Sequence, residues 1–510
     1  MPITICSRSA HDATNPRERI PDITATGVNT IGSISLALDP ATLRHPVAAR
    51  PLLSGVLPPL VFGTATFNHQ FNKDPYALQP NTIVQHALAS GIRAFDTSPY
   101  YGPAETILGG ALHSELVSND QQLQHLTRED YLLLTKCGRI AGNEFDYSPE
   151  WIRFSVRRSL RRLKTTYLDV VYLHDVEFVS PAEVLTGIRT LRQIRDESRT
   201  IRYVGICGYP VDILADLAEL VKLETGESLD IVQSYANYTI QNQQLLDRGL
   251  SRFLNAGVDV VPNASPLGMG LLRSVGVPLG DSNGSWHPAP DELRHACLKA
   301  AQHVEQERNE KLESLAVRFA MQSWCDKGSL VGSSGSTPRE AISALMKRSE
   351  GSTKKGDCVA THGEQAHSGR PRLGVSVMGV SKLSELEGTM SVYNSILDSD
   401  RFTSECSDGS QEQVEDIAQY IREHILGIDW TDHAWASPDP GFVNQRKHFG
   451  GSDEEQDSDS AEANASGDLF VPEGPSANET KEATLVFPTN AEGMSKMKSQ
   501  AEVAGISNMT

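Results

Sequence analysis

The sequence lacks the cysteine spacings that bind metal ions or build a disulfide framework. It has seven cysteines in 510 residues, and no two of them form a CxxC pair. An odd number of scattered cysteines in a long chain favours free thiols in a reducing compartment. No group of histidines and carboxylates has the spacing of a zinc site, so we expect no metal centre. The seven are Cys6, Cys137, Cys207, Cys297, Cys325, Cys358 and Cys406.

Long apolar runs and an excess of positive charge are also missing. No run is long enough to span a bilayer, and the first residues have no apolar core followed by a cleavage site. The formal net charge is -19. This charge disfavours nucleic acid as a partner, because phosphate binding needs clustered lysine and arginine. We therefore expect a cytoplasmic protein with no nucleic-acid partner and no membrane partner.

Three polar segments flank or interrupt a region of more ordinary composition. We expect residues 1–55 to be a disordered N-terminal segment and residues 437–510 to be a disordered acidic tail. Residues 56–436 remain for one large domain. It is interrupted at about 328–372 by a basic stretch rich in Ser, Gly, Lys and Arg. A loop of this length is uncommon in a compact domain, so we expect a disordered insertion, either inert or a regulatory docking loop.

Short apolar runs alternate with helical patterns through the large domain. The runs are near-continuously apolar, which is typical of parallel strands buried on both faces. Eight such units predict a (β/α)8 TIM barrel. A doubly wound sheet would need a G-x-G-x-x-G turn after its first strand, and residues 63–67 (GTATF) lack it. The expected strands are 61–62, 93–96, 131–136, 168–174, 203–206, 229–233, 258–262 and 375–379.

Polar residues stand at the carboxyl ends of several of these strands. Asp96 ends the second strand and Lys136 the third, while His174 ends the fourth and Gln233 the sixth. Tyr101 lies on the turn after the second strand, five residues beyond the aspartate. Catalytic groups of such barrels sit at the carboxyl ends of the strands, so these side chains should converge on one mouth. Each residue alone could have a purely structural role. A purely structural role for all of them would require several coincidences.

The same residue types suit general acid/base chemistry without a metal. A free tyrosine has a pKa of about 10 and is a poor proton shuttle at neutral pH. The Lys136 ammonium should lower the pKa of Tyr101, and Asp96 should keep that ammonium charged and in place. A neutral His174 can then hold a substrate oxygen. No serine or cysteine motif for nucleophilic catalysis competes with this interpretation.

Three stretches resemble the catalytic tetrad of the aldo-keto reductases. They are 95–102 (FDTSPYYG), 134–136 (LTK) and 172–175 (YLHD). The resemblance covers about 57–327 and 374–436. It implies that the barrel binds a nicotinamide cofactor, which carries the redox chemistry.

The resemblance also implies a role for each tetrad member. Tyr101 would exchange a proton with the substrate oxygen, tuned by Asp96 and Lys136. His174 would orient the substrate hydroxyl or carbonyl. Within the family the chain is most similar to the fungal NAD-dependent D-arabinose 1-dehydrogenases and the plant L-galactose dehydrogenases, most specifically over 165–178. These enzymes imply a small sugar substrate, with oxidation of an aldose at C1 to an aldonolactone and hydride transfer to NAD.

The family pattern further indicates which residues would hold the cofactor. Glu385 stands where members that prefer NADP carry an arginine, which favours NAD, although Lys382 could still recruit the extra phosphate of NADP. A helix is expected to begin just after Lys382, and the N-terminus of a helix is a favourable place for a phosphate group. The implied cofactor contacts are Gly63, Thr64, Gln233, Ser265, Pro266, Leu267, Gly379, Ser381 and Lys382.

Two other functions stay open at this point. An NADPH-dependent carbonyl or aldehyde reductase would use the same fold and the same residues. A cofactor-sensing regulatory subunit, similar to the β subunits of potassium channels, would use the fold as a binding module. D-Arabinose, L-galactose and L-fucose stay open as substrates, and so does the choice between a monomer and a homodimer.

Overall fold

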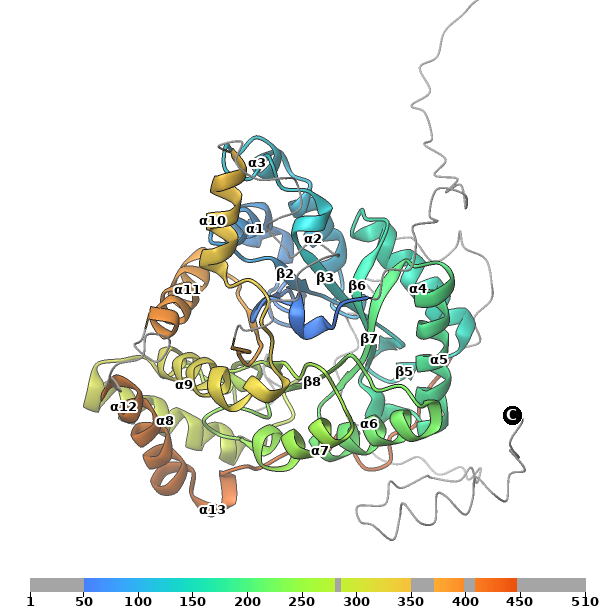
Figure 1. Ribbon diagram of the computed structural model, residues 1–510. Helices are drawn as coiled ribbons and strands as arrows, with labels where there is room; N and C mark the ends of the chain where they lie inside the picture. Colours follow the sequence, from blue (N-terminus) through green and yellow to red (C-terminus); the bar gives the residue numbers. More distant parts are fainter. Residues whose placement is uncertain (1–49, 280–285, 350–370, 399–408, 447–510) are drawn as a thin grey trace, which may run out of the picture. The chain divides into compact units, whose positions relative to one another are not determined.

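The computed structural model describes residues 50–279, 286–349, 371–398 and 409–446, which contain a closed barrel of parallel strands. The strand order around the barrel is β1-β10-β9-β8-β7-β6-β3-β2 (Figure 1). The predicted (β/α)8 TIM barrel is confirmed. The strands are β1 (Leu60–Gly63), β2 (Ala94–Asp96), β3 (Leu132–Cys137), β6 (Leu168–His174), β7 (Ile201–Gly208), β8 (Ile231–Tyr235), β9 (Asn263–Ala264) and β10 (Ser376–Gly379).

Most residues of the barrel strands are buried, on both faces of the sheet. In β1, Leu60 and Phe62 pack into the cluster formed with the surrounding helices, whereas Val61 packs into the cluster inside the barrel. This alternation follows from the period of two along a strand. The interior cluster also contains Tyr172 and Tyr203, so side chains fill the barrel. Burial on both faces is the reason that near-continuous apolar runs predicted these strands.

Helices cover the outside of the barrel (Figure 1). The helix after β3 begins at an N-cap visible in the sequence, because Ser148 Oγ accepts a hydrogen bond from Trp151 N at 3.3 Å. Within the described ranges, no helix has the length and apolar character needed to cross a membrane. The helices are α1 (Pro80–Ala89), α2 (Ala104–Leu112), α3 (Glu115–Ser118), α4 (Pro149–Arg162), α5 (Pro181–Glu197), α6 (Val211–Thr225), α7 (Leu250–Asn255), α8 (Asp291–Arg308), α9 (Leu312–Lys327), α10 (Pro338–Ser349), α11 (Leu383–Asp398), α12 (Gly409–Tyr420) and α13 (Gly427–Trp430).

The seventh barrel strand differs from its prediction. The apolar run predicts a strand over 258–262, but the structure has β9 at Asn263–Ala264 and one isolated parallel bridge between Ile231 and Val260. Pro262 has no N–H to donate to a neighbouring strand, which accounts for the break between them.

The segment predicted as a disordered insertion, about 328–372, is corrected in its first part. Helix α10 lies within it, and Ala341 and Leu345 on this helix are buried. Residues spaced by four lie on one face of a helix, so these two side chains dock α10 on the barrel. The basic composition concealed this short apolar face. Residues 350–370 lie outside the described part of the chain.

Packing also extends further at both ends than the predicted boundaries at 55 and 437. Leu53 is buried in the cluster inside the barrel. Near the other end, the ring of Phe442 lies edge-on to Phe145 and Phe178, with centroids 6.0 and 4.9 Å away. Single apolar side chains within polar segments make these contacts. Residues 1–49 and 447–510 are outside the part that the structure describes.

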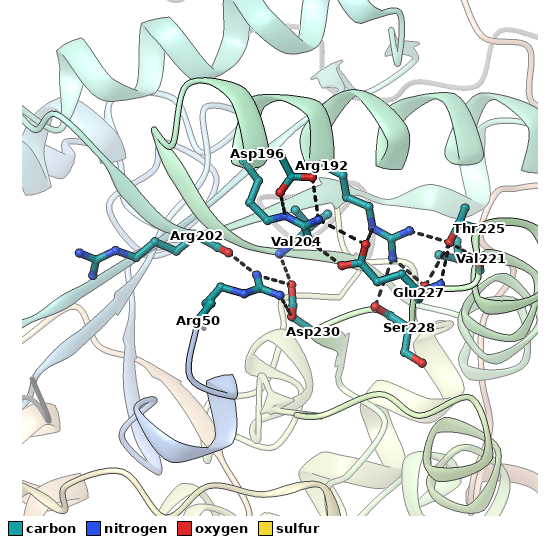
Figure 2. Close-up of polar contacts among 11 residues, drawn as sticks. Arg50, Arg192, Asp196, Arg202, Val204, Val221, Thr225, Glu227, Ser228 and Asp230 are labelled. Carbon is teal, nitrogen blue, oxygen red and sulfur yellow. Dashed lines mark hydrogen bonds and ion pairs between the residues drawn. The ribbon is translucent and has the colours of Figure 1, made fainter. Parts of the chain in front are cut away.

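An ion-pair network lies at the amino-terminal ends of β7 and β8 (Figure 2). Arg50 donates to both carboxylate oxygens of Asp230, at 2.8 and 3.1 Å, and to the backbone carbonyl of Arg202. Asp230 also accepts from Val204 N at 2.8 Å. The Arg50 guanidinium lies 4.7 Å from the centroid of the Tyr203 ring. Arg50 therefore fastens the beginning of the described chain to the strand ends.

We expect Arg50→Ala to lower the free energy of unfolding by about 1 kcal/mol, because a partly buried ion pair and its stacking contact are lost together. Urea denaturation followed by circular dichroism measures the change. Arg339→Ala is the matched control, since its ion pair with Asp398 is exposed and should contribute less. Equal losses in the two variants would contradict the structural role of Arg50.

Candidate functional site

The carboxyl ends of β2 and β3 bring a lysine and an aspartate into contact. Lys136 Nζ lies 2.6 Å from Asp96 Oδ1 and donates to the carbonyl oxygen of Thr97 at 2.9 Å. The two charged side chains are buried, with 2% and 4% of their surfaces exposed. Strand pairing fixes their proximity, because Asp96 pairs in register with Leu134, two residues before the lysine.

Burial and pairing act in opposite directions on this ion pair. Burial lowers the pKa of Lys136, but the charge of Asp96 and the neighbouring groups raise it by more, so the pKa of Lys136 is raised. Burial raises the pKa of Asp96, against the lowering effect of Lys136. The ammonium group therefore stays charged at neutral pH.

Tyr101 lies on the turn that follows β2. Its N–H donates to Ser98 O at 3.1 Å, and Gly102 adopts a positive φ of 56°, a conformation that favours glycine. The turn places the centroid of the Tyr101 ring 4.8 Å from Lys136 Nζ. The same ring lies edge-on to His174, with centroids 5.7 Å apart. Tyrosine, lysine and histidine thus face one another at one end of the barrel.

The pKa of Tyr101 departs from the expectation. Burial raises it above its ordinary value, and the lowering effect of the Lys136 ammonium is the smaller of the two. The charge of Asp96 raises the pKa of Tyr101 further. Tyr101 therefore keeps its proton at neutral pH, and Lys136 limits the shift without reversing it. The sequence shows the charge beside the phenol but not the depth of burial.

His174 is held as a neutral imidazole. Burial lowers its pKa well below the ordinary value, and the charges of Lys136 and Arg139 lower it further. Ser98 Oγ accepts from Tyr100 N at 3.1 Å and lies 3.0 Å from His174 Nδ1, so its hydrogen is free to be donated to Nδ1. The ring proton then belongs on Nε2, where it can be donated to a substrate oxygen.

Gln233 lies within β8 and belongs to the same mouth. Its Oε1 accepts a hydrogen bond from Tyr172 Oη at 3.3 Å, and 5% of the residue is exposed. The Tyr172 ring is in turn close to Lys136, with Nζ 5.8 Å from its centroid. Gln233 is therefore connected to the lysine through one aromatic side chain.

Gly63, Gly379 and Ser381, three of the residues expected to contact a cofactor, lie at the ends of β1 and β10 or just beyond. Gly63 and Gly379 pair in register on these strands. Asn72 donates to Ser381 Oγ at 3.0 Å, which links the loop after β1 to the start of α11. Glu385 Oε2 accepts from Ser381 N at 2.8 Å, so a carboxylate caps the N-terminus of that helix.

The segment after β9 completes the expected cofactor contacts. Ser265 has a positive φ of 58°, and its Oγ accepts from Met269 N at 2.9 Å. Pro266 is buried, Leu267 is partly buried, and Lys382 is exposed at the start of α11. The exposed Gly379 and the N-terminus of α11 would suit the phosphates of a nicotinamide dinucleotide. In the residues searched, histidines, cysteines and carboxylates form no group that could hold a metal ion.

Sequence reasoning missed residues that hold the site in place. Tyr147 Oη donates to the carbonyl oxygen of His174 at 2.5 Å. Thr64, expected only as a cofactor contact, donates through N and Oγ1 to the carbonyl oxygen of Asp96, at 2.8 and 3.1 Å. Ser98 was recognisable, since it lies in the stretch between the aspartate and the tyrosine. The loop around Tyr147 carries no sequence signal of its role.

The segment after α13 also reaches the mouth. The Trp435 ring stacks on Tyr209 with centroids 4.5 Å apart, and Ser437 Oγ donates to Glu177 Oε1 at 2.9 Å. Burial and the charge of Asp175 raise the pKa of Glu177 to about 8, so Glu177 is largely protonated at neutral pH. The stacking of Trp435 on Tyr209 fixes this segment to the barrel.

Comparison with known proteins connects this site to a family. Residues 59–405 match the family model described as the aldo/keto reductase family. The chain belongs to the aldo/keto reductase family. It is 42% identical over 275 residues to D-arabinose 1-dehydrogenase of Saccharomyces cerevisiae, covering 54% of this chain and 78% of that protein. It is 35% identical over 266 residues to L-galactose dehydrogenase of Arabidopsis thaliana, covering 52% and 77%.

A more distant relative carries a similar description. The chain is 24% identical over 325 residues to D-threo-aldose 1-dehydrogenase of a Pseudomonas species, covering 58% of this chain and 90% of that protein. As an aldo/keto reductase with dehydrogenase relatives, the chain is an oxidoreductase that takes a nicotinamide cofactor.

We expect the His174 ring to be neutral at about pH 6.5, where a free imidazole is half protonated, because burial and two cations depress its pKa. Proton–nitrogen NMR of the full chain, assigned with a His174→Gln variant, measures this directly. A midpoint at about 6.5 would contradict the assignment. The contribution of His174 to stability should be present above about pH 6.5 and lost as the pH falls, because below that pH the unfolded chain takes up the proton first.

Proposed function

We propose that this chain is an NAD-dependent aldose 1-dehydrogenase, which oxidises an aldose at C1 to the aldonolactone. The observation that carries the proposal is the cluster of Tyr101, Lys136, Asp96 and His174 at the carboxyl ends of the barrel strands. A tyrosine beside a fixed ammonium and a neutral histidine supplies a proton-transfer group and a hydrogen-bond donor for one oxygen. The descriptions of the two most similar relatives given above support an aldose as the substrate.

In the proposed reaction, the C1 hydroxyl gives its proton to the Tyr101 phenolate as C1 releases hydride and the C1–O bond becomes a carbonyl. The bound nicotinamide supplies the hydride acceptor. Lys136 stabilises the phenolate by its charge, and His174 Nε2–H holds the oxygen as it changes from hydroxyl to carbonyl. The products are a lactone and a neutral phenol, whose proton is then lost to water. Position and charge are the contribution of the protein.

The residues that would hold the cofactor favour NAD over NADP. Glu385 lies at the N-terminus of α11, held on Ser381 N. A carboxylate at this position would repel the 2′-phosphate of NADP. Gln233, close to the lysine, would hold the nicotinamide carboxamide, and the exposed Lys382 is the one cation of this set that would attract the additional phosphate.

The sugars in the relatives' descriptions narrow the proposed substrate class. D-Arabinose and L-galactose have the same configuration at C2, C3 and C4, and so does L-fucose. A site that recognises the hydroxyl groups on C2, C3 and C4 would accept all three sugars. We therefore propose aldoses with this configuration as substrates.

One observation favours the reverse reaction as a second candidate function. Burial raises the pKa of Tyr101, so the phenol keeps its proton at neutral pH and is ready to donate it to a carbonyl oxygen. An NADPH-dependent aldehyde or carbonyl reductase would use the phenol in this state. Rates of aldose oxidation with NAD and of aldehyde reduction with NADPH distinguish the two candidate functions.

An aldose panel assayed with NAD and with NADP tests the proposed function. We expect oxidation of D-arabinose, L-galactose and L-fucose with NAD, followed as NADH absorbance. In Tyr101→Phe the rate should fall by about 100-fold or more, because general acid/base catalysis is lost. Tyr420→Phe, at an exposed tyrosine of α12, is the matched control and should keep the wild-type rate.

Two results would reject the proposed function. One is clear turnover of aldehydes with NADPH while no aldose is oxidised, which supports the reductase. The other is equal turnover by wild type and Tyr101→Phe across the panel, which removes the tyrosine from the chemistry.

Glu385→Arg should shift the ratio of kcat/KM for NAD to that for NADP toward NADP by about tenfold or more, because the repelling carboxylate becomes a cation. Glu387→Arg makes the same change in charge at an exposed position on the same helix and should shift the ratio far less. An unchanged ratio in Glu385→Arg would show that this carboxylate does not select the cofactor.

A further inference from the structure

An ion pair between Arg139 and Asp175 stands beside the catalytic cluster and takes no part in the proposed proton transfer. Arg139 begins the short hairpin strand β4 (Arg139–Ala141) after β3, and Asp175 directly follows His174. Arg139 Nη1 donates to Asp175 Oδ2, and Nη2 donates to Tyr100 Oη at 2.9 Å. The guanidinium also lies 3.8 Å from the centroid of the Tyr100 ring.

This pair has two buried polar atoms without a hydrogen-bond partner among the described residues. They are Asp175 Oδ1, an acceptor, and Arg139 Nε, a donor. The Asp175 side chain is 2% exposed. Buried polar atoms of folded proteins are nearly always paired, and an unpaired atom on a charged group is especially costly. A ligand that can both donate and accept would satisfy the two atoms together.

The pair lies close to the atom that would hold the reacting oxygen. His174 Nε2 and Asp175 Oδ2 are 3.7 Å apart. The mouth remains open on the outer side of the pair, because 16% of the Arg139 side chain is exposed and Tyr100 is partly exposed. A ligand bound through His174 can therefore present its next polar group to Asp175 and Arg139.

We propose that Arg139 and Asp175 bind the C2 hydroxyl of the aldose. A hydroxyl has the required chemistry, since its oxygen accepts from Arg139 Nε and its hydrogen is donated to Asp175 Oδ1. The place fits because oxygens on adjacent sugar carbons lie within hydrogen-bond reach of each other. This inference rests on the proposed aldose 1-dehydrogenase function and deepens it, because it assigns two specificity-determining residues and the substrate group that they read.

The selection of a 2-hydroxy sugar follows from the same two atoms. A site built to hydrogen-bond a hydroxyl rejects the analogue that lacks it, because its own polar atoms are then left unpaired. A 2-deoxy sugar would leave both Asp175 Oδ1 and Arg139 Nε without partners. The pair thus selects against 2-deoxy sugars and against simple alcohols and aldehydes, which carry no hydroxyl on the neighbouring carbon.

The test compares D-arabinose with 2-deoxy-D-erythro-pentose, the same pentose without its C2 hydroxyl, as substrates of the full chain with NAD. We expect wild type to prefer D-arabinose by about 10- to 100-fold in kcat/KM. The double variant Arg139→Met/Asp175→Leu removes both charges, which folded proteins tolerate better than the loss of one. It should lose most of this preference, mainly through the KM for D-arabinose.

Matched controls distinguish a loss of substrate recognition from a general loss of folding or stability. Arg252→Met/Asp216→Leu removes an ion pair of 2.6 Å between α6 and α7 and should keep the wild-type preference. NAD binding, followed by quenching of protein fluorescence, shows that each variant is folded. Asp175→Asn is the second variant, and its preference for D-arabinose should lie between those of wild type and the double variant.

Two results would overturn the inference while the proposed function stands. One is equal kcat/KM of the wild type for the two sugars. This result would reject recognition of the C2 hydroxyl even if no variant folds. The other is a folded double variant that keeps the wild-type preference. A wild type that oxidises no aldose at all has a different signature: it rejects the proposed function first and the inference with it.

Discussion

The ammonium group of Lys136 is the charge on which the whole site depends. It is buried, so it would be costly without the Asp96 carboxylate 2.6 Å away. Its charge acts to lower the pKa of both Tyr101 and His174, the two groups that would meet a substrate oxygen, although burial raises the pKa of Tyr101 by more. The parallel register of β2 and β3 fixes the lysine and the aspartate together. One cation, positioned by strand pairing, thus acts on the protonation of both partners.

Burial and charge compete at this mouth, and they have different outcomes for the two groups. For His174 both effects lower the pKa, so the ring is neutral and Nε2–H can serve as a donor. For Tyr101 burial wins over the ammonium, so the phenol is protonated at neutral pH. Such a site donates a proton readily at neutral pH and accepts one more readily as the pH rises. The proposed oxidation should therefore be fastest in alkaline solution.

The barrel and the placing of Asp96, Lys136 and His174 could be predicted because they depend on local patterns. A buried parallel strand is near-continuously apolar, and polar side chains near its carboxyl end can face the mouth. The supporting contacts depend on tertiary packing and could not be read this way. Tyr147 reaches His174 from a loop of unremarkable composition. Helix α10 was missed because a few buried apolar side chains outweigh a basic composition once a surface is present to dock on.

The central claim is that the Lys136 charge makes the Tyr101 phenolate accessible for proton transfer. The most direct measurement is the pH dependence of kcat/KM for aldose oxidation in wild type and Lys136→Met. The account predicts a rising limb that moves to higher pH by at least about one unit in the variant, with a loss of about 100-fold or more near pH 7. A variant with the wild-type pH profile and only a higher KM would contradict it.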